Sequence, residues 1–210
     1  MRVKFYREHK YVSAALNDLE RKIAKTDFRN SQETEVVLKE WQELSEMLHG
    51  HAEYEEERLH GLLEKKGSAV HLLAHAQHEE MDQAFGVIDG LFVLLSKERE
   101  EEMRTEIGYR LYLTYRKFVG DNLVHLHEEE TKILPELQRL YTDEELREVE
   151  HATYQVMTPT EMLEMLNVLF PHMNAQDKEA FLEDIRLAQP EKFQEIIGKI
   201  PGLDSNLGVC

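Results

Sequence analysis

Apolar residues recur at helical spacing through most of this 210-residue chain. After His9, apolar side chains follow at three, seven, ten and fourteen residues, and this spacing keeps them on one helix face. Asn30 with Glu33 is typical of a helix start, and Gly67 after two lysines is typical of a helix end. Asn-Gly hairpin turns and alternating Val, Ile and Thr runs are lacking. The pattern predicts four long helices, over residues 2–25, 30–66, 68–95 and about 100–139.

Four long helices with short connections fold most simply into an all-α, antiparallel up-down-up-down four-helix bundle. Further helix starts are marked by Thr142, Thr158 and Asn174, each with an acidic residue three positions later. The sequence therefore predicts a bundle over residues 1–140 and a C-terminal helical extension over 141–210. We expect two or three shorter helices within 141–199 and an extended or mobile tail after residue 200.

Two copies of a helical hairpin follow one another along the chain. When His9 is placed over His78, and His51 over His125, the apolar positions around each pair coincide. Each copy supplies one histidine from its first helix and a His-x-x-x-Glu pair from its second. The repeat thus places six side chains on core-facing stripes: His9, His51, Glu55, His78, His125 and Glu129.

These six residues form a candidate site for a pair of metal ions. Histidine and glutamate four residues apart share a helix face, and buried carboxylates without partners are costly. A metal pair offsets that cost, and imidazole with carboxylate suits iron or manganese. A single buried histidine usually finds an ordinary hydrogen-bond partner instead, so a metal-free bundle is the alternative. The match of six residues across a repeat favours the metal.

The neighbouring polar residues leave further alternatives. His75, one turn before His78, is either a fifth histidine ligand or an outer hydrogen-bond donor. Asp121, one turn before His125, could accept a hydrogen bond from that ring, although a solvated helix charge is the simpler role. Glu56 and Glu130 are expected on a solvated face. Three histidines lie off the repeat and are expected at exposed or rim positions: His49, His60 and His127.

The motifs resemble those of the hemerythrin, or His-His-Glu cation-binding, family. They are His9, His51-Ala-Glu-Tyr-Glu55-Glu56, His78-Glu-Glu-Met and His125-Leu-His-Glu-Glu129-Glu130 with Leu134-Pro135. The resemblance covers about residues 1–140. It implies a four-helix bundle around two iron ions, bridged by two carboxylates and an oxo or hydroxo group. Manganese or zinc could replace the iron.

The ligand pattern departs from that of the oxygen-carrying hemerythrins. Those proteins have five histidines, and an aspartate five residues after the last of them; here Glu129 follows His125 by four residues. The pattern looks closer to that of the hemerythrin-like repair-of-iron-centres proteins and iron-sensing hemerythrin domains. The resemblance therefore favours a non-haem di-iron protein that binds or senses O₂, NO or an oxidant such as peroxide.

Three alternatives remain for the function. The first is a di-iron enzyme of iron-centre repair, or of NO or peroxide turnover. The second is an iron-responsive regulatory module that binds a protein partner through its C-terminal helices. The third is a ferritin-like oxidase, whose Glu-x-x-His signature occurs at Glu57–His60 and Glu148–His151. The first of these pairs lacks an equivalent in the repeat, and the second lies outside the four long helices, so the oxidase is the least favoured.

The composition limits the classes of partner and the cellular compartment that we expect for this protein. The chain has 25 Lys and Arg against 42 Asp and Glu, a net charge of −17, which disfavours nucleic acid and anionic membranes as partners. One cysteine, Cys210, excludes an intramolecular disulfide and a multi-cysteine metal site. No apolar run has the length of a transmembrane helix, and the first residues lack a signal-peptide core. We therefore expect a cytoplasmic protein.

Overall fold

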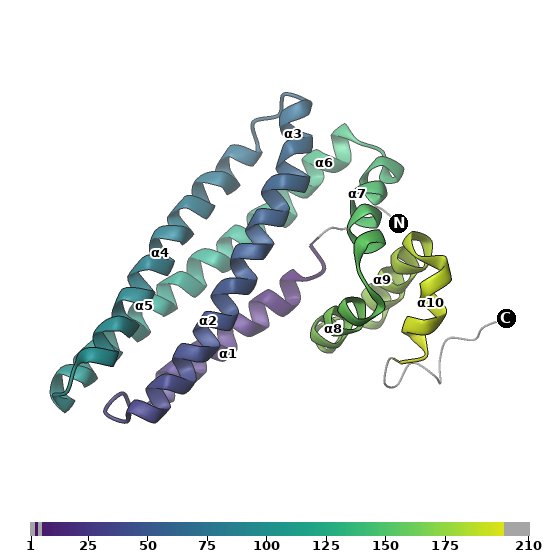
Figure 1. The fold of residues 1–210 in the computed structure, drawn as a ribbon. Helices are drawn as coiled ribbons and strands as arrows, with labels where there is room; N and C mark the ends of the chain where they lie inside the picture. The colour runs from purple at the N-terminus through teal and green to yellow at the C-terminus, as the bar shows by residue number, and fades with distance from the viewer. Residues whose placement is uncertain (1–2, 4–5, 200–210) are drawn as a thin grey trace. The chain divides into compact units, whose positions relative to one another are not determined.

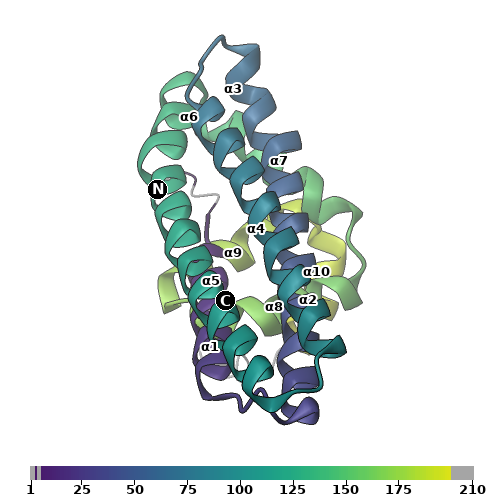
Figure 2. The same ribbon diagram turned by 90° about the vertical axis from the view of Figure 1, so that its left-hand side faces the viewer.

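A computed structural model describes residue 3 and residues 6–199, and all regular structure within this part of the chain is helical. The first half contains α1 (His9–Lys25) and α2 (Ser31–Tyr54), which continues through a π-helical segment η1 (Glu55–His60) into α3 (Gly61–Lys65). Next come α4 (His71–Lys97) and α5 (Glu101–Glu128), which continues through a second π-helical segment, η2 (Glu129–Ile133), into α6 (Leu134–Leu140). Figures 1 and 2 show α2, α4 and α5 side by side as a bundle. The prediction of an all-helical bundle is confirmed.

The chain divides into two compact units. One is Val12–Leu137, and the other combines Met1–Tyr11 with Gln138–Cys210. Helix α1 passes without interruption from the second unit into the first. The predicted division into residues 1–140 and 141–210 stays a prediction.

The stripes predicted from the repeat form the core of the unit Val12–Leu137. All the aligned apolar positions are buried except Met81, which is half-buried. Trp41 is fully buried and makes ring contacts with Phe85, Tyr115 and Phe118, at centroid distances of 5.4, 5.9 and 5.6 Å. These contacts place Trp41 and Tyr115 in the packed core of this unit.

Most helix ends follow the predicted signals. The Asn30 side chain accepts hydrogen bonds from the backbone N–H groups of Gln32 and Glu33. The Glu33 carboxylate accepts from the backbone N–H of Asp27 rather than closing the expected capping box. Gly67 ends the second long helix with a φ of 71°, a conformation that glycine adopts at no steric cost. The first helix, predicted from residue 2, begins only at His9, and residues 6–8 form a turn.

Arg104 forms hydrogen bonds with both connecting segments at one end of the bundle. Its guanidinium is buried and donates to the backbone oxygens of Phe28, Leu95 and Glu98, and to Oγ1 of Thr34. These bonds satisfy carbonyl groups of both connecting segments. No sequence signal predicts this role, because Arg104 lies in an ordinary charged stretch of α5.

Residues 141–199, all of them described, contain four α-helices where two or three were predicted. These helices are α7 (Asp143–Val156), α8 (Pro159–Leu169), α9 (Ala175–Ala188) and α10 (Pro190–Ile197), with a short 3₁₀ turn, η3 (Phe170–His172). The capping boxes at Thr142 and Thr158 and the cap at Asn174 are present as predicted. The unpredicted break falls at Gln189, before the proline that opens α10. The predicted tail, residues 201–210, lies outside the described residues.

Among the described residues, no helix is long and apolar enough to cross a membrane.

Candidate metal centre

Both glutamates singled out by the repeat open a π-helical segment. Glu55 is the first residue of η1 and Glu129 the first of η2, and both side chains have 0% exposure. A π-helix bonds residues five apart instead of four, and short π segments within α-helices occur frequently at functional sites. The two copies of the repeat therefore share a backbone irregularity as well as side chains.

Glu55 lies between histidines of two different helices. Its Oε1 atom is 3.3 Å from Nε2 of His51 in α2, and its Oε2 atom is 3.6 Å from Nε2 of His78 in α4. In the second copy, Oε2 of Glu129 lies 3.4 Å from Nε2 of His125 in α5. Each oxygen of the Glu55 carboxylate thus lies beside a different histidine, which fits a role as a metal ligand.

Potential ligand atoms gather in two overlapping sets. In one set, atoms of Glu55, His78, His125 and Glu129 all lie within 4.8 Å of one another. In the other, atoms of His51, Glu55 and Glu129 do so. Both glutamates belong to both sets, whereas the histidines differ. This sharing fits two neighbouring metal ions with carboxylates in common.

The rings of His78 and His125 meet edge to face, with planes inclined by 66° and their Nε2 atoms 3.1 Å apart. Nδ1 of His78 is 3.0 Å from Oε1 of Glu56, and Nδ1 of His125 is 3.0 Å from Oε1 of Gln77. Both oxygens are acceptors, so each neutral ring keeps its proton on Nδ1 and turns the Nε2 lone pair inward. Two lone pairs at this distance repel each other unless a cation or a proton is shared between them. The ring orientations therefore fit a bound cation.

Two side chains fix these orientations from outside. The Gln77 amide donates from Nε2 to Oε2 of Glu128 at 2.9 Å, which leaves its Oε1 atom facing His125. Glu56 supplies a carboxylate to His78. Outer acceptors of this kind set the tautomer and the basicity of ligating histidines. Glu56 keeps 40% of its side chain exposed, as expected of a residue on a solvated face, and it also accepts from Nδ1 of His78. Gln77 rather than Asp121 is the partner of His125. Asp121 pairs with Lys117 at the surface, in the simpler role expected for it.

The electrostatics of the centre favour positive charge. Burial disfavours the charged form of His78, but hydrogen bonds and charge from Glu55 and Glu56 outweigh burial and raise its pKa above the usual value. Desolvation likewise acts against ionised Glu56, yet its hydrogen bonds with His78 and His75 lower its pKa. Both pKa shifts result from the attraction between a carboxylate and a protonated imidazole.

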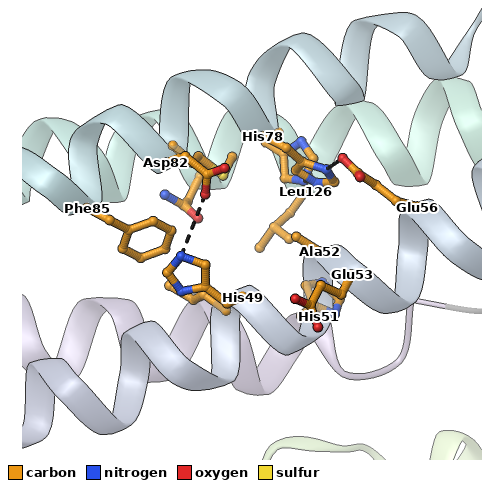
Figure 3. A pocket seen from close by; sticks show the side chains of 13 residues that line it. His49, His51, Ala52, Glu53, Glu56, His78, Asp82, Phe85 and Leu126 are labelled. Carbon is orange, nitrogen blue, oxygen red and sulfur yellow. Dashed lines mark hydrogen bonds and ion pairs between the residues drawn. The ribbon is translucent and has the colours of Figure 1, made fainter.

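A cavity of about 140 Å³ adjoins the centre within the unit Val12–Leu137 (Figure 3). His51, His78 and His125 lie in its wall together with apolar side chains such as Phe85. His49 lies on the same wall, 3.6 Å from Asp82 through Nε2, and stacks on Phe85 with ring centroids 4.1 Å apart. Because a water molecule occupies about 30 Å³ in the liquid, the cavity suits a ligand of a few atoms.

The remaining candidate histidines are placed as follows. His75 is exposed, with Nδ1 3.1 Å from Oε1 of Glu56, and belongs to neither donor set. His49 and His127 are exposed, as predicted. His60 is only 5% exposed, so its predicted rim position is wrong. The π segment explains the error, because it brings residues five apart together and turns His60 to the buried side with Glu55.

Burial also decides the charge state of His60. Desolvation lowers its pKa to about 4, against the raising effect of Glu55. The ring stacks near that of His78, with centroids 5.8 Å apart and planes inclined by 19°. His60 is therefore a neutral aromatic neighbour of the centre.

His9 opens helix α1 and is buried. It lies one turn before Val12, the first of the four buried apolar residues on the same stripe of α1. The helix is continuous from His9 to Lys25. The role of His9 as a ligand remains a prediction.

A helical bundle with a buried cluster of histidines and glutamates defines a cation-binding domain. The model of the hemerythrin HHE cation-binding domain matches residues 2–137, and the chain belongs to this family. No curated protein and no solved structure matches the chain.

Proposed function

We propose that this chain is a hemerythrin-like protein that holds two iron ions and binds or senses O₂, NO or an oxidant such as peroxide. The observation that carries the proposal is the pair of opposed Nε2 atoms of His78 and His125, flanked by two glutamates that belong to both donor sets. One ion would be held by His51 and the other by His78 and His125, with Glu55 and Glu129 shared, and His9 is the further predicted ligand.

The donor chemistry favours iron. Imidazole and carboxylate without thiolate suit iron, and also manganese or zinc. Bound iron would supply electron exchange with a small ligand, which zinc would not. The six proposed side chains offer fewer donors than two six-coordinate ions accept, so positions remain for a ligand from outside. The adjoining cavity of about 140 Å³ has the size for a diatomic molecule or peroxide.

The protein's own residues prepare the centre for that ligand. Glu56 and Gln77 hold the rings of His78 and His125 with their Nε2 atoms inward. The cavity beside the centre is lined by apolar side chains such as Phe85 and Leu126 and by polar ones such as Asn122. The resemblance to iron-repair and iron-sensing hemerythrin-like proteins belongs to this proposal, and the centre is compatible with sensing and with turnover.

The test is metal analysis of the purified, iron-reconstituted protein, followed by anaerobic titration with O₂ and NO under optical spectroscopy. We expect about two irons per chain and a spectral change that saturates with ligand. His78→Ala should lose iron, whereas His127→Ala, at an exposed position in the same helix as His125, should not. Absence of stoichiometric metal would refute the proposal. Steady-state consumption of peroxide or NO that is absent in His78→Ala would assign the enzymatic alternative.

A further inference from the structure

His60 has a buried nitrogen that the proposed centre does not use. The side chain is only 5% exposed, and its Nε2 atom forms no hydrogen bond with any described residue. Buried polar atoms in proteins are nearly always paired, and an exception often marks an ion-binding or functional position. The neutral ring has one nitrogen lone pair to offer to a cation. His60 belongs to neither donor set of the centre, so its buried nitrogen needs a separate explanation.

A second histidine lies close to His60. It is His71, the first residue of α4, and the two ring centroids are 6.1 Å apart. With metal–nitrogen bonds of about 2.1 Å, two imidazoles that share one cation hold their ring centroids roughly 5–6.5 Å apart. The spacing of His60 and His71 therefore suits a shared cation.

The contacts of His71 leave a nitrogen lone pair for the same cation. Its Nδ1 atom lies 2.9 Å from the backbone oxygen of Ser68. Because a carbonyl oxygen only accepts, the neutral ring has its proton on Nδ1 and its lone pair on Nε2. Ser68 is itself held in place, since its Oγ donates to Oε1 of Glu136 at 2.9 Å. A backbone or carboxylate acceptor behind the ring is typical of histidines that bind metals.

Three histidines form a series that leads to the proposed centre. His71 is half-buried, His60 is buried, and His78 is a proposed ligand. The ring centroids of His60 and His78 are 5.8 Å apart, so the two steps of the series are nearly equal in length. All three residues belong to the unit Val12–Leu137. A buried metal site requires an entry path, and this series runs from a partly accessible side chain to a ligand.

We propose that His60 and His71 form a transient cation site through which Fe(II) reaches the metal centre. This inference rests on the proposed function, in which His78 holds one of the metal ions. Two neutral imidazoles bind a cation more weakly than a site that also has two carboxylates, so the ion moves on to the centre. His60 and His71 therefore control the rate of metal uptake, and the number of ions bound at the centre does not depend on them.

The test measures the rate of metal uptake by the full chain, in stopped-flow mixing of the metal-free protein with Co(II), whose visible absorption reports its coordination. His60→Phe and His71→Phe keep an aromatic ring of similar size and remove the nitrogens. We expect each to slow uptake at least about tenfold, because each removes one of two ligands, and to bind as much metal as the wild type at the end. His75→Phe is the matched control, because His75 is exposed and lies one turn further along α4; it should take up metal at the wild-type rate.

A second readout uses nitrogen NMR of the histidine rings. Zn(II) added to the wild type after the centre is saturated should shift the resonances of two further histidines. These two resonances should be missing from the spectra of His60→Phe and His71→Phe and present in that of His75→Phe. If no further histidine resonance shifted, the site at His60 and His71 would be refuted.

The outcomes separate this inference from the proposed function. Wild-type uptake rates in His60→Phe and His71→Phe, with the full amount of metal bound, would overturn the entry path and leave the proposed function intact. Slowing in His75→Phe alone would place the entrance at the exposed contact of His75 with Glu56 and would also overturn it. A wild-type protein that binds no stoichiometric metal would refute the proposed function and this inference together.

Discussion

Replacement of Glu56 should weaken metal binding although Glu56 is not itself a proposed ligand. Its Oε1 atom accepts from Nδ1 of His78 at 3.0 Å, which fixes the ring with Nε2 toward the centre and makes that nitrogen a stronger donor. Loss of an outer partner of this kind typically lowers metal affinity about 10- to 100-fold. In free energy this range is about 1.4 to 2.7 kcal/mol.

The variants Glu56→Gln and Glu56→Ala should differ in metal affinity. In Glu56→Gln an amide oxygen can still accept from His78, but a hydrogen bond to a charged acceptor is roughly twice as strong as a neutral one. We therefore expect about a tenfold loss for Glu56→Gln, and a loss nearer 100-fold for Glu56→Ala. The contact between His75 and the same carboxylate is exposed, so its loss should change metal affinity little.

The assay is competition for Fe(II) or Zn(II) with a chromophoric chelator of known affinity. Glu57→Gln is the matched control, since Glu57 is the next residue of the same π segment and is exposed. It removes the same charge from the chain and should leave affinity unchanged. If Glu56→Ala and Glu57→Gln bound metal equally well, the assigned role of Glu56 would be wrong.

Three further predictions concern stability. Arg104→Leu leaves buried carbonyl groups unpaired, at about 1–3 kcal/mol each, so it should lower the free energy of unfolding by at least about 3 kcal/mol in urea titrations. Gly108→Ala would force a Cβ atom into the side chain of Phe28, and overpacking of this kind costs about 1–3 kcal/mol. Burial raises the pKa of Glu150 to about 8, with Arg7 opposing the shift, so the folded chain keeps a proton that the unfolded chain releases above its ordinary pKa of about 4.5. Stability should fall as pH rises between these values, and Glu150→Gln should remove that part of the slope.

Each of these predictions has its own control. Gly120→Ala lies in the same helix as Gly108 but meets open space, so it should stabilise the protein slightly through helix propensity; equal effects at both glycines would contradict the packing argument. Met103→Leu, beside Arg104 but exposed, should be nearly neutral. The carboxyl of Glu150 also faces Asp184, Glu8 and Arg147. The free energies of unfolding of the wild type and Glu150→Gln are compared at several pH values. If their difference stayed constant from pH 5 to pH 8, the raised pKa of Glu150 would be refuted.

The helical repeat predicted the bundle and the buried glutamates because both depend on periodicity. The side chains at His9, Glu55, His78, His125 and Glu129 are all buried, as expected of a core-facing stripe. Local signals such as the Thr142 and Thr158 capping boxes also work from sequence, because they involve residues only three positions apart.

What the sequence could not supply depends on backbone irregularity or on contacts between distant segments. The buried position of His60 follows from a π turn, which an α-helical spacing rule cannot anticipate. Gln77 reaches His125 from another helix, 48 residues away in the chain, and no pattern within either helix signals that pairing. The attachment of Arg7 to Asp184 joins residues 177 positions apart, so it emerges only from the tertiary structure.

We propose that the buried histidines and glutamates hold a pair of iron ions, and iron reconstitution tests this. The most direct measurement is the iron content per chain after anaerobic reconstitution and desalting, made in parallel on the wild type and on the double variant Glu55→Gln/Glu129→Gln. We expect about two irons per wild-type chain and almost none in the variant, in which neither shared carboxylate remains. Equal iron in both proteins, or no stoichiometric iron in the wild type, would contradict it.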